Sequence, residues 1–293
     1  MAPMALPDAG LAIVSIGDFV REGAYRVHSR FRRAVNLTDA SGLVSLVAPA
    51  VGAGPLNIVV RGLVPSGVER IRVFPAQVDV DETSLAYDRS RLYSSRIELE
   101  QVDFATLQRR LPLLGRLLVE LAPPKSLAFL LADDTLSDFR PGFERTLARH
   151  VSRCVKESLS DNEARGIERL LGCGFGLTPS GDDFVAGALT AMSAFEQATG
   201  TRLIRVRERV LSKVRTSNII SDTLLSLAAA GRVCASVKSL IAALGSGSDA
   251  QVRAACRRVL AHGSTSGADF TVGLCLFLRS RLLVPAPLST TRQ

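Results

Sequence analysis

The sequence predicts an α+β fold in which an N-terminal antiparallel β-rich domain, either a barrel or a sandwich, precedes a mainly α-helical domain. Two features of the 293 residues predict it. Short apolar runs rich in Val and Ile, separated by turn residues, occupy the first part of the chain. The apolar spacing then changes to the three and four residues of helices. We expect the β-rich domain over residues 1–101, the helical domain over 102–284 and a loose polar tail over 285–293.

The strands are expected at the apolar runs of the first domain. Gly, Pro, Asp and Ser separate these runs at short intervals, which favours antiparallel strands joined by turns. The expected strands are residues 11–16, 33–37, 43–47, 57–60, 70–74 and 95–99.

The helices of the second domain are expected to be amphipathic, because apolar residues recur at i, i+3 and i+4 with charged residues between them. Pro112 lies inside the first of these segments and is expected to kink or interrupt the helix. The expected amphipathic helices are residues 104–121, 143–159, 163–171, 203–214, 219–230, 233–244 and 250–260.

Composition excludes several classes of protein. Hydrophobic residues make up 47% and charged residues 22% of the chain, which is too apolar for disorder. No apolar run reaches the ~20 residues that a membrane-spanning helix needs, and the start lacks the basic region of a secretory signal. We therefore expect a cytoplasmic protein. Five cysteines without a CxxC pair indicate buried free thiols and argue against a zinc site.

The formal net charge of +8 would suit an anionic partner. The basic residues are scattered along amphipathic segments, and the chain has no Trp and three Tyr for stacking on bases. We therefore expect neither nucleic acid nor a membrane as the partner. A small anionic substrate carrying carboxylate or phosphate, or an acidic partner subunit, fits the charge better.

A glycine-rich stretch at residues 172–183 is the most distinctive motif. It reads GCGFGLTPSGDD and leads directly into an apolar run. Alternate glycines permit positive φ, so we expect a tight loop that opens into a helix. With Ser180 as N-cap, the first-turn N–H groups would face the loop and form an anion-binding site. The motif is not a P-loop, since Asp182 stands where the P-loop has lysine.

Helix capping is the alternative explanation of this motif. Ser180 and Asp183 have the spacing of a capping box, which is common in helices without catalytic roles. Capping alone leaves the alternate glycines, Thr178, Pro179 and Asp182 without a reason. We therefore favour a binding or catalytic function for the loop.

A related element lies near the C-terminus, at residues 264–273. It reads STSGADFTVG and shares Ser-Gly-x-Asp-Phe and a later glycine with residues 178–187. Both are hydroxyl-rich loops opening into nearly uncharged helices, which belong in the middle of a domain. Gly187 and Gly273 would let these helices approach closely. We expect the helices to cross near their N-terminal ends and to direct their polar groups into one shared pocket.

Three aspartates are the candidate catalytic residues: Asp182, Asp183 and Asp269. Because carboxylates repel anions, three roles stay open for them. They could hold a Mg²⁺ that a phosphate also contacts, bind an amide or amine end of the substrate, or supply a general base. Too few oxygens converge for a dedicated metal cage, so no metal site and no cofactor are predicted, and Mg²⁺ is the one option considered.

The candidate substrate-binding residues come from three parts of the chain. Arg215 suits bidentate recognition of a carboxylate or phosphate, and Thr216 or Ser217 would serve equally well to cap the next helix. Polar positions in the strand-like runs of the first domain complete the set. The candidates are Gly176, Thr178, Ser180, Gly181, Arg215, Thr216, Ser217, Ser264, Thr265, Ser266, Gly267, His28, Asn36 and Asn57.

At these residues the sequence resembles a known family. The resemblance rests on GFGLTPSGDD at residues 174–183, the segment 215–221, the Ser-Thr-Ser-Gly-x-Asp element at 264–269, and residues 28–36 with 54–57. They are similar to a bacterial family long described as a domain of unknown function, which includes a subunit of oxamate carbamoyltransferase from anaerobic allantoin degradation. The resemblance covers most of residues 25–280.

This resemblance implies a carbamoyltransferase-type subunit that works with other subunits on oxamate or oxalurate and carbamoyl phosphate, or on a similar small anionic metabolite. The carbamoyl group would pass between oxalurate and phosphate. Asp182 would then accept from the carbamoyl NH₂ group and Arg215 would bind the substrate carboxylate, with catalysis by positioning and electrostatics. The alternative is a non-catalytic subunit that binds a phosphorylated metabolite and regulates or scaffolds partner enzymes.

Overall fold

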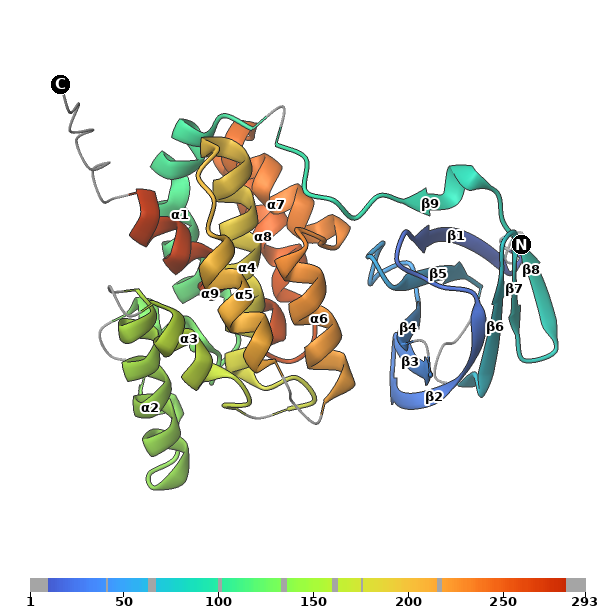
Figure 1. Ribbon diagram of the computed structural model, residues 1–293, viewed down its shortest axis with the longest axis horizontal. Coiled ribbons are helices and arrows are strands. Elements are labelled where there is room, and N and C mark those ends of the chain that lie inside the picture. The colour runs from blue at the N-terminus through green and yellow to red at the C-terminus, as the bar shows by residue number, and fades with distance from the viewer. Residues whose placement is uncertain are drawn as a thin grey trace, which may run out of the picture. The chain divides into compact units, whose positions relative to one another are not determined.

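The computed structural model describes residues 10–40, 42–62, 67–99, 102–132, 136–159, 163–174, 176–214 and 218–282. Its contacts divide the chain into two compact units. Unit 1 is Met1–Ile97 with Arg232–Lys238, and unit 2 is Glu98–Gly231 with Ser239–Gln293. Figure 1 shows strands in unit 1 and helices in unit 2, which confirms the predicted α+β class. The predicted tail at 285–293 lies outside the described residues.

Unit 1 is a curled, mixed sheet with the strand order β8-β7-β6-β2-β3-β4-β5-β1-β9. Among the described strands, neighbours are antiparallel except for the pairs β4–β5 and β1–β9. The sheet curls far enough for β8, at one edge, to contact β1. The strands are β1 (Ala12–Gly17), β2 (Gly23–Phe31), β3 (Ala34–Asp39), β4 (Gly42–Val47), β5 (Asn57–Arg61), β6 (Arg70–Phe74), β7 (Gln77–Val80), β8 (Thr83–Ala86) and β9 (Leu92–Tyr93).

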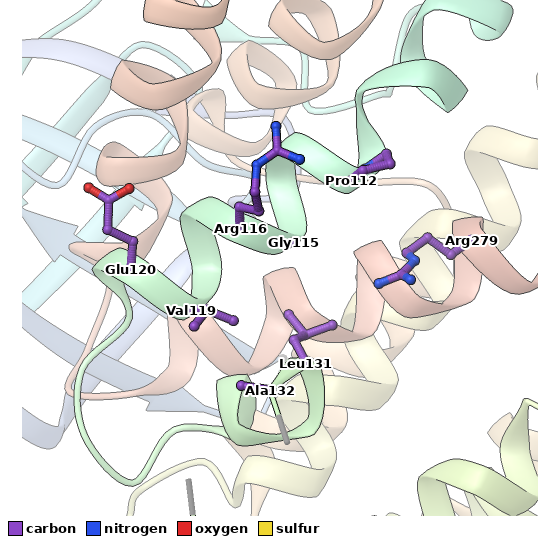
Figure 2. A pocket seen from close by; sticks show the side chains of 8 residues that line it. All are labelled: Pro112, Gly115, Arg116, Val119, Glu120, Leu131, Ala132 and Arg279. Carbon is purple, nitrogen blue, oxygen red and sulfur yellow. The ribbon is translucent and has the colours of Figure 1, made fainter. Parts of the chain in front are cut away.

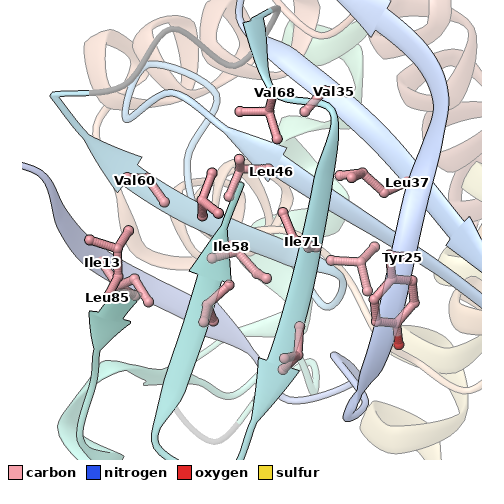
Figure 3. Close-up of a cluster of buried hydrophobic side chains, with 14 of the residues drawn as sticks. Ile13, Tyr25, Val35, Leu37, Leu46, Ile58, Val60, Val68, Ile71 and Leu85 are labelled. Atoms are coloured by element: carbon pink, nitrogen blue, oxygen red, sulfur yellow. The ribbon is translucent and has the colours of Figure 1, made fainter. Parts of the chain in front are cut away.

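The core of unit 1 lies on the concave face of this sheet. In β6, Ile71 and Val73 are buried while Arg70 and Arg72 are exposed, as the two-residue period of a strand requires. Figure 3 shows the buried side chains from successive strands facing one another, with Leu85 of β8 beside Ile13 of β1. This alternation places the basic residues of β6 on the outer face, away from the core.

The end of unit 1 differs from the sequence-based prediction. Residues 95–99 form no strand, and Arg96 instead makes an isolated bridge with Arg232. The Arg232 guanidinium donates to Asp18 Oδ2 at 2.8 Å, and the Val233 N–H donates to the Ser95 carbonyl at 2.9 Å. A segment far along the chain thus completes unit 1, which no local pattern indicates.

The helices are close to those that the periodicity predicts, and all lie in unit 2 except the first residues of α7, which belong to unit 1. They are α1 (Phe104–Leu121), α2 (Phe143–Ser158), α3 (Glu163–Leu170), α4 (Ser180–Thr199), α5 (Ile204–Lys213), α6 (Ile219–Ala229), α7 (Ala235–Ser246), α8 (Asp249–Leu260) and α9 (Ser266–Leu282). Short 3-10 helices lie at η2 (Arg89–Arg91, in unit 1), η3 (Leu127–Leu131) and η4 (Leu136–Asp138). The helix α1 continues through Pro112 and is not interrupted there.

The helices α4 and α9 form the centre of unit 2. Residues 180–194 of α4 are all buried, and α9 is buried along most of its length. The helices α6 and α3 pack on α4, while α1, α8 and η3 pack on α9. Within the described parts of the chain, no helix is long and apolar enough to cross a membrane. The five cysteines are free, and Cys154, Cys256 and Cys275 are buried as expected.

Candidate functional site

The buried helices α4 and α9 cross at two glycines. A Cβ atom on Gly187 would lie 1.9 Å from the Phe270 carbonyl oxygen, and one on Gly273 would lie 2.1 Å from the Phe184 carbonyl oxygen. Both distances are far below van der Waals contact, so only glycine fits at either position. The expected close approach of the two helices is therefore confirmed. Each glycine packs on the phenylalanine three residues before the other glycine.

The glycine-rich loop brings the chain from α3 into α4. Gly172, Gly174 and Gly176 have φ values of 74°, 130° and 104°, in the region that favours glycine. A Cβ atom on Gly174 would also lie 2.4 Å from the Ser180 backbone nitrogen. The loop thus folds back tightly over the first residue of α4, as the alternate glycines predict.

The start of α4 differs from the predicted cap. Ser180 is the first helical residue, Pro179 occupies the N-cap position, and no side chain caps the helix. Asp183 therefore forms no capping box with Ser180. Its Oδ2 atom instead accepts a hydrogen bond from the Thr178 hydroxyl at 3.0 Å. The serine and the aspartate that suggested a capping box have other partners in the folded protein.

Backbone carbonyl groups already accept hydrogen bonds from most first-turn N–H groups. The Gly181 N–H donates to the Cys173 carbonyl oxygen at 2.7 Å, and the Gly267 N–H donates to the His262 carbonyl oxygen at 3.0 Å. The next N–H groups of α4 and α9 donate to the carbonyl groups of Pro179 and of residue 265. The predicted arrangement, in which these N–H groups face the loop, is thus largely replaced by backbone capping. Side-chain hydroxyl and carboxyl groups are left as the main groups for recognition.

Side chains join the two loops at the starts of α4 and α9. Thr178 Oγ1 lies 3.0 Å from Ser266 Oγ, and it also contacts Asp183. Hydroxyl groups stabilise the charge of each aspartate from the opposite helix: Ser266 on Asp183, and Ser180 on Asp269. We call these five residues, Thr178, Ser180, Asp183, Ser266 and Asp269, the carboxyl cluster. The structure brings together the two motifs that the sequence singled out.

The electrostatics of the cluster favour a protonated carboxyl group. Burial is the largest cause that raises the pKa of Asp183 to about 7, with a smaller rise from the nearby Asp269 carboxylate and an opposing lowering by the Ser266 and Thr178 hydroxyls. Burial also raises the pKa of Asp269 to about 6. The Leu127 N–H, which donates to Asp269 Oδ1 at 2.6 Å, opposes that rise. At neutral pH the cluster thus holds a carboxyl group that can both donate and accept a proton.

Asp182 faces a different set of partners. Its Oδ1 atom accepts a hydrogen bond from the Gly172 N–H at 2.7 Å, so it ties the glycine-rich loop to α4. Burial raises the pKa of Asp182, while the Gly172 N–H and the Ser221 hydroxyl of α6 lower it. Asp182 Oδ2 and Ser221 Oγ are buried, and neither makes a well-aligned hydrogen bond within the described residues. Asp182 therefore ties the glycine-rich loop to α4 and lies near the Ser221 hydroxyl of α6.

The other candidates of unit 2 lie around this cluster. Gly181 and Gly267 allow the starts of α4 and α9 to pack closely on the helices that precede them, since a Cβ atom on each would lie 2.0 Å from a carbonyl oxygen of the preceding helix. Thr265 lies beside Asp269 and lowers its pKa, and Ser264 and Gly176 are exposed on the two loops. Arg215, Thr216 and Ser217 lie outside the described residues, so their proposed roles stay predictions. The N-cap of α6 is Asn218.

Three candidates lie in unit 1. His28 is exposed on β2. The Asn36 side chain joins three strands, because its amide donates to Ser29 at 3.1 Å and its oxygen accepts from Ser45 at 2.8 Å. Asn57 donates to the Gly52 carbonyl oxygen at 2.9 Å and supports a loop. The hydrogen bonds of Asn36 and Asn57 give these two residues structural roles within unit 1.

Two partners of the buried aspartates were not among the predicted site residues: the Leu127 backbone N–H, which contacts Asp269, and the Ser221 hydroxyl, which acts on Asp182. Leu127 acts through its backbone N–H, which no side-chain pattern reveals. Ser221 lies on the first turn of α6, where a buried hydroxyl among apolar residues is the one signal that could have drawn notice. Both come from segments distant in the sequence, so only the packing of α6 on α4 and of η3 on α9 brings them in.

Unit 2 also has a groove lined by residues outside the carboxyl cluster. Its volume is about 430 Å³, and it lies between α1, the η3 region and the C-terminal half of α9 (Figure 2). Arg116 and Arg279 flank its apolar wall. Among the described residues, no group of three or more His, Cys, Asp or Glu side chains is placed to hold a metal ion.

One comparison with known proteins gave a match. Residues 170–278 match the family described as oxamate carbamoyltransferase subunit AllH, which confirms the resemblance for the motifs within that range; the motifs at 28–36 and 54–57 lie outside the match. The matched region runs from the end of α3 through most of α9 and contains the whole carboxyl cluster. No curated protein and no solved structure matches the chain.

Proposed function

We propose, on the premise that residues 170–278 belong to the oxamate carbamoyltransferase subunit family, that this chain is a subunit of such an enzyme and that its carboxyl cluster binds the small anionic substrates. The family description is that of a subunit, which supports action together with other protein chains. The proposed reaction transfers a carbamoyl group between oxalurate and phosphate.

The chemistry of the cluster supports recognition of a small anion. Thr178 and Ser266 are partly exposed at the joined loops, where their hydroxyl groups can donate to phosphate or carboxylate oxygens. The N-terminal ends of two helices lie behind these groups, and their dipoles add a favourable field for negative charge although backbone carbonyl groups accept most of the first-turn N–H groups. A protonated Asp183 removes the repulsion that a carboxylate would exert on the anion and adds one more donor.

The reaction needs one proton to move in each direction. As the bond between the carbamoyl carbon and the amide nitrogen of oxalurate breaks, Asp183 gives its proton to that nitrogen, which leaves as the amide of oxamate. As a phosphate oxygen bonds to the same carbon, the Asp183 carboxylate takes the phosphate hydroxyl proton. Carbamoyl phosphate and oxamate result, and Asp183 returns to its starting state. A pKa near neutrality suits this exchange.

The single observation behind this proposal is the meeting of Asp183, Thr178 and Ser266 at the start of two crossing helices within the matched region. For Asp182, the hydrogen bond to Gly172 supports a role in holding the loop. This differs from the role in binding the carbamoyl NH₂ group that the resemblance implied.

The test replaces Asp183 by Asn in the enzyme assembled with its partner subunits. We expect kcat for carbamoyl transfer to fall by a factor of about 10² to 10⁴, because general acid–base catalysis is lost. The matched control is Asp249→Asn, which removes an exposed carboxylate from the first turn of α8 in the same unit. Calorimetric titration with carbamoyl phosphate then measures binding by each variant.

The outcomes separate the two functions considered for this chain. If the Asp183→Asn enzyme binds carbamoyl phosphate and transfers the carbamoyl group at the wild-type rate, the cluster is not catalytic. A chain that binds the ligand but whose cluster does not affect turnover would be the regulatory or scaffolding subunit. Loss of turnover in Asp249→Asn as well would show that the assay reports general damage to unit 2.

A further inference from the structure

The groove between α1, η3 and α9 is a surface that the proposed catalytic role does not use. None of its lining residues belongs to the carboxyl cluster, and its volume is about 430 Å³. On α1 the lining residues Pro112, Gly115, Arg116 and Val119 recur at i, i+3, i+4 and i+7, so they form one stripe along the helix. The groove lies outside the matched residues 170–278, so the family match assigns it no role.

The groove stays open because α1 has a glycine at its centre. A Cβ atom on Gly115 would meet only Arg279 Nη1 outside its own helix, at 3.8 Å. Leu131 and Ala132 are half-buried at the end of η3, and Val119 is 45% exposed. Figure 2 shows the Arg279 side chain directed from α9 toward Gly115 and Leu131. An apolar surface beside a guanidinium group thus remains uncovered.

The charge of the groove is positive. Glu120 is the one carboxylate among its described lining residues, and both its oxygens accept from the Arg253 guanidinium of α8, at 2.6 and 2.8 Å. Among the residues that the structure describes, neither Arg116 nor Arg279 has an ion pair or a hydrogen bond. The helix dipole gives Arg279 a reason to lie in the last turn of α9, but Arg116 lies in the middle of α1. The two guanidinium groups therefore remain available for an acidic partner.

The exposure of the groove favours a protein segment over a small molecule. Small-molecule sites bury most of the surface of their ligand, whereas Arg116, Val119 and Glu120 are exposed along this groove. An apolar centre with charged residues at its edge is the composition of a protein interface, in which a side chain fills a pocket and polar groups surround it. Guanidinium groups at such an edge bind carboxylates with two hydrogen bonds each.

The groove is also adjacent to the carboxyl cluster through one short helix. η3 begins at Leu127, whose N–H donates to Asp269 Oδ1 at 2.6 Å, and ends at Leu131 in the groove. The helix α9 contributes Asp269 to the cluster and Arg279 to the groove. A protein bound in the groove would therefore contact the elements that hold Asp269 and use no residue of the cluster.

We propose that this groove is the docking site for an acidic segment of a partner subunit. An apolar side chain of that segment packs on Leu131 and Val119, and its carboxylates bind Arg116 and Arg279. The inference rests on the proposed function, in which this chain acts together with other subunits.

The test measures the binding of the purified partner subunits to the full chain by isothermal titration calorimetry, at about 0.05 and 0.3 M salt. The variant combines Arg116→Gln with Arg279→Gln, which removes both charges and keeps long polar side chains. We expect Kd to rise by a factor of about 10 or more, and the remaining binding to depend less on salt. The matched control combines Arg109→Gln with Arg149→Gln, which removes two exposed arginines outside the groove and should leave Kd unchanged.

A second variant blocks the groove without changing its charge. Gly115→Leu places an apolar side chain where only the flexible Arg279 side chain lies nearby, so the chain should fold, and circular dichroism checks this. It should weaken binding of the partner subunits more than Gly115→Ala does. Unchanged binding by a folded Gly115→Leu chain overturns the proposal, and if that chain does not fold, unchanged binding by the double arginine variant overturns it.

Other occupants of the groove give different results. Sedimentation velocity of the chain alone tests for a second copy: self-association that the double arginine variant abolishes, with partner binding unchanged, overturns the proposal. Titration with octanoate tests for a small carboxylate with an apolar chain. Binding of octanoate that the variant loses, again with partner binding unchanged, also overturns it.

These measurements distinguish the docking site from the proposed function. An assembled enzyme that transfers the carbamoyl group, and whose assembly is the same in the groove variants, refutes the docking site and leaves the function. A complex that the groove variants weaken, but that transfers no carbamoyl group, refutes the function and leaves the docking site.

Discussion

Replacing Gly187 by alanine tests the contact on which the site depends. The new Cβ atom would lie 1.9 Å from the Phe270 carbonyl oxygen. Since the shortest ordinary carbon–oxygen contacts are about 3.3 Å, the helices must separate by roughly 1.4 Å at this point. The atom that it meets belongs to the backbone of α9, so no side-chain rotation relieves the clash.

The cost follows from the packing that such a separation disrupts. A gap of about 0.5–1 Å already forfeits a quarter to a half of the dispersion energy of each contact, and overpacked cores lose about 1–3 kcal/mol or more. Alanine regains about 1 kcal/mol of helix propensity. Taking the upper part of the overpacking range and subtracting the regained propensity, we expect Gly187→Ala to lower the free energy of unfolding by about 1–2 kcal/mol. Gly273→Ala should cost a similar amount, because its Cβ atom would lie 2.1 Å from the Phe184 carbonyl oxygen.

Urea unfolding monitored by circular dichroism measures these changes. The matched control is Gly115→Ala in α1, where the nearest atom to the new Cβ would be Arg279 Nη1 at 3.8 Å. That variant should be as stable as wild type or more stable by up to about 1 kcal/mol. The double variant of Gly187 and Gly273 should cost less than the sum, since one separation accommodates both methyl groups. A Gly187→Ala protein within about 0.5 kcal/mol of wild type would refute the argument from close contact.

Two further predictions concern pH and unit 1. Because the pKa values of Asp183 and Asp269 rise from 3.8 to about 7 and about 6, the folded protein binds more protons than the unfolded chain between about pH 4 and 7. The free energy of unfolding should therefore fall as pH rises through this range, and it should fall less in Asp183→Asn. Urea unfolding measures it, and equal free energies of unfolding of the wild-type protein at pH 5 and pH 8 would contradict the prediction. In unit 1, Asp18→Ala leaves the Arg232 guanidinium and the Ser95 N–H without their acceptor and should cost about 1–3 kcal/mol in thermal or urea unfolding. Glu69→Ala, which removes an exposed ion pair with Arg30, should cost under about 1 kcal/mol, and an equal loss in both variants would show that burial is not the cause.

The local patterns of the sequence predicted much of the fold. Helical periodicity located the amphipathic helices, because each buries one face and the spacing of its apolar residues reports that face. Strands β2, β7, β8 and β9 were not among the expected strands. In β2 the exposed Arg26, His28 and Arg30 interrupt the apolar run, and β7 and β8 are only four residues each. Alternation over so few residues is too short a signal to separate a strand from a loop.

The site was predicted in part, for similar reasons. Alternate glycines and the two Ser-Gly-x-Asp motifs pointed to the loops before α4 and α9, since glycine at positive φ and at helix crossings leaves a trace in the sequence. The hydrogen-bonding partners of the aspartates have no recognisable pattern in the sequence. The Leu127 N–H and the Ser221 hydroxyl reach the aspartates only through packing, and backbone carbonyl groups replaced the expected Ser180 cap.

The sequence by itself determined the α+β class, the positions of most helices, the two glycine-dependent loops and the family resemblance, because these follow from spacing and residue type along short stretches. Only the tertiary structure decided that each aspartate faces the serine of the other helix, that Asp183 and Asp269 have raised pKa values, and that Arg232–Lys238 joins unit 1. Burial and long-range hydrogen bonds depend on which segments meet in space, and spacing along the chain does not encode that directly.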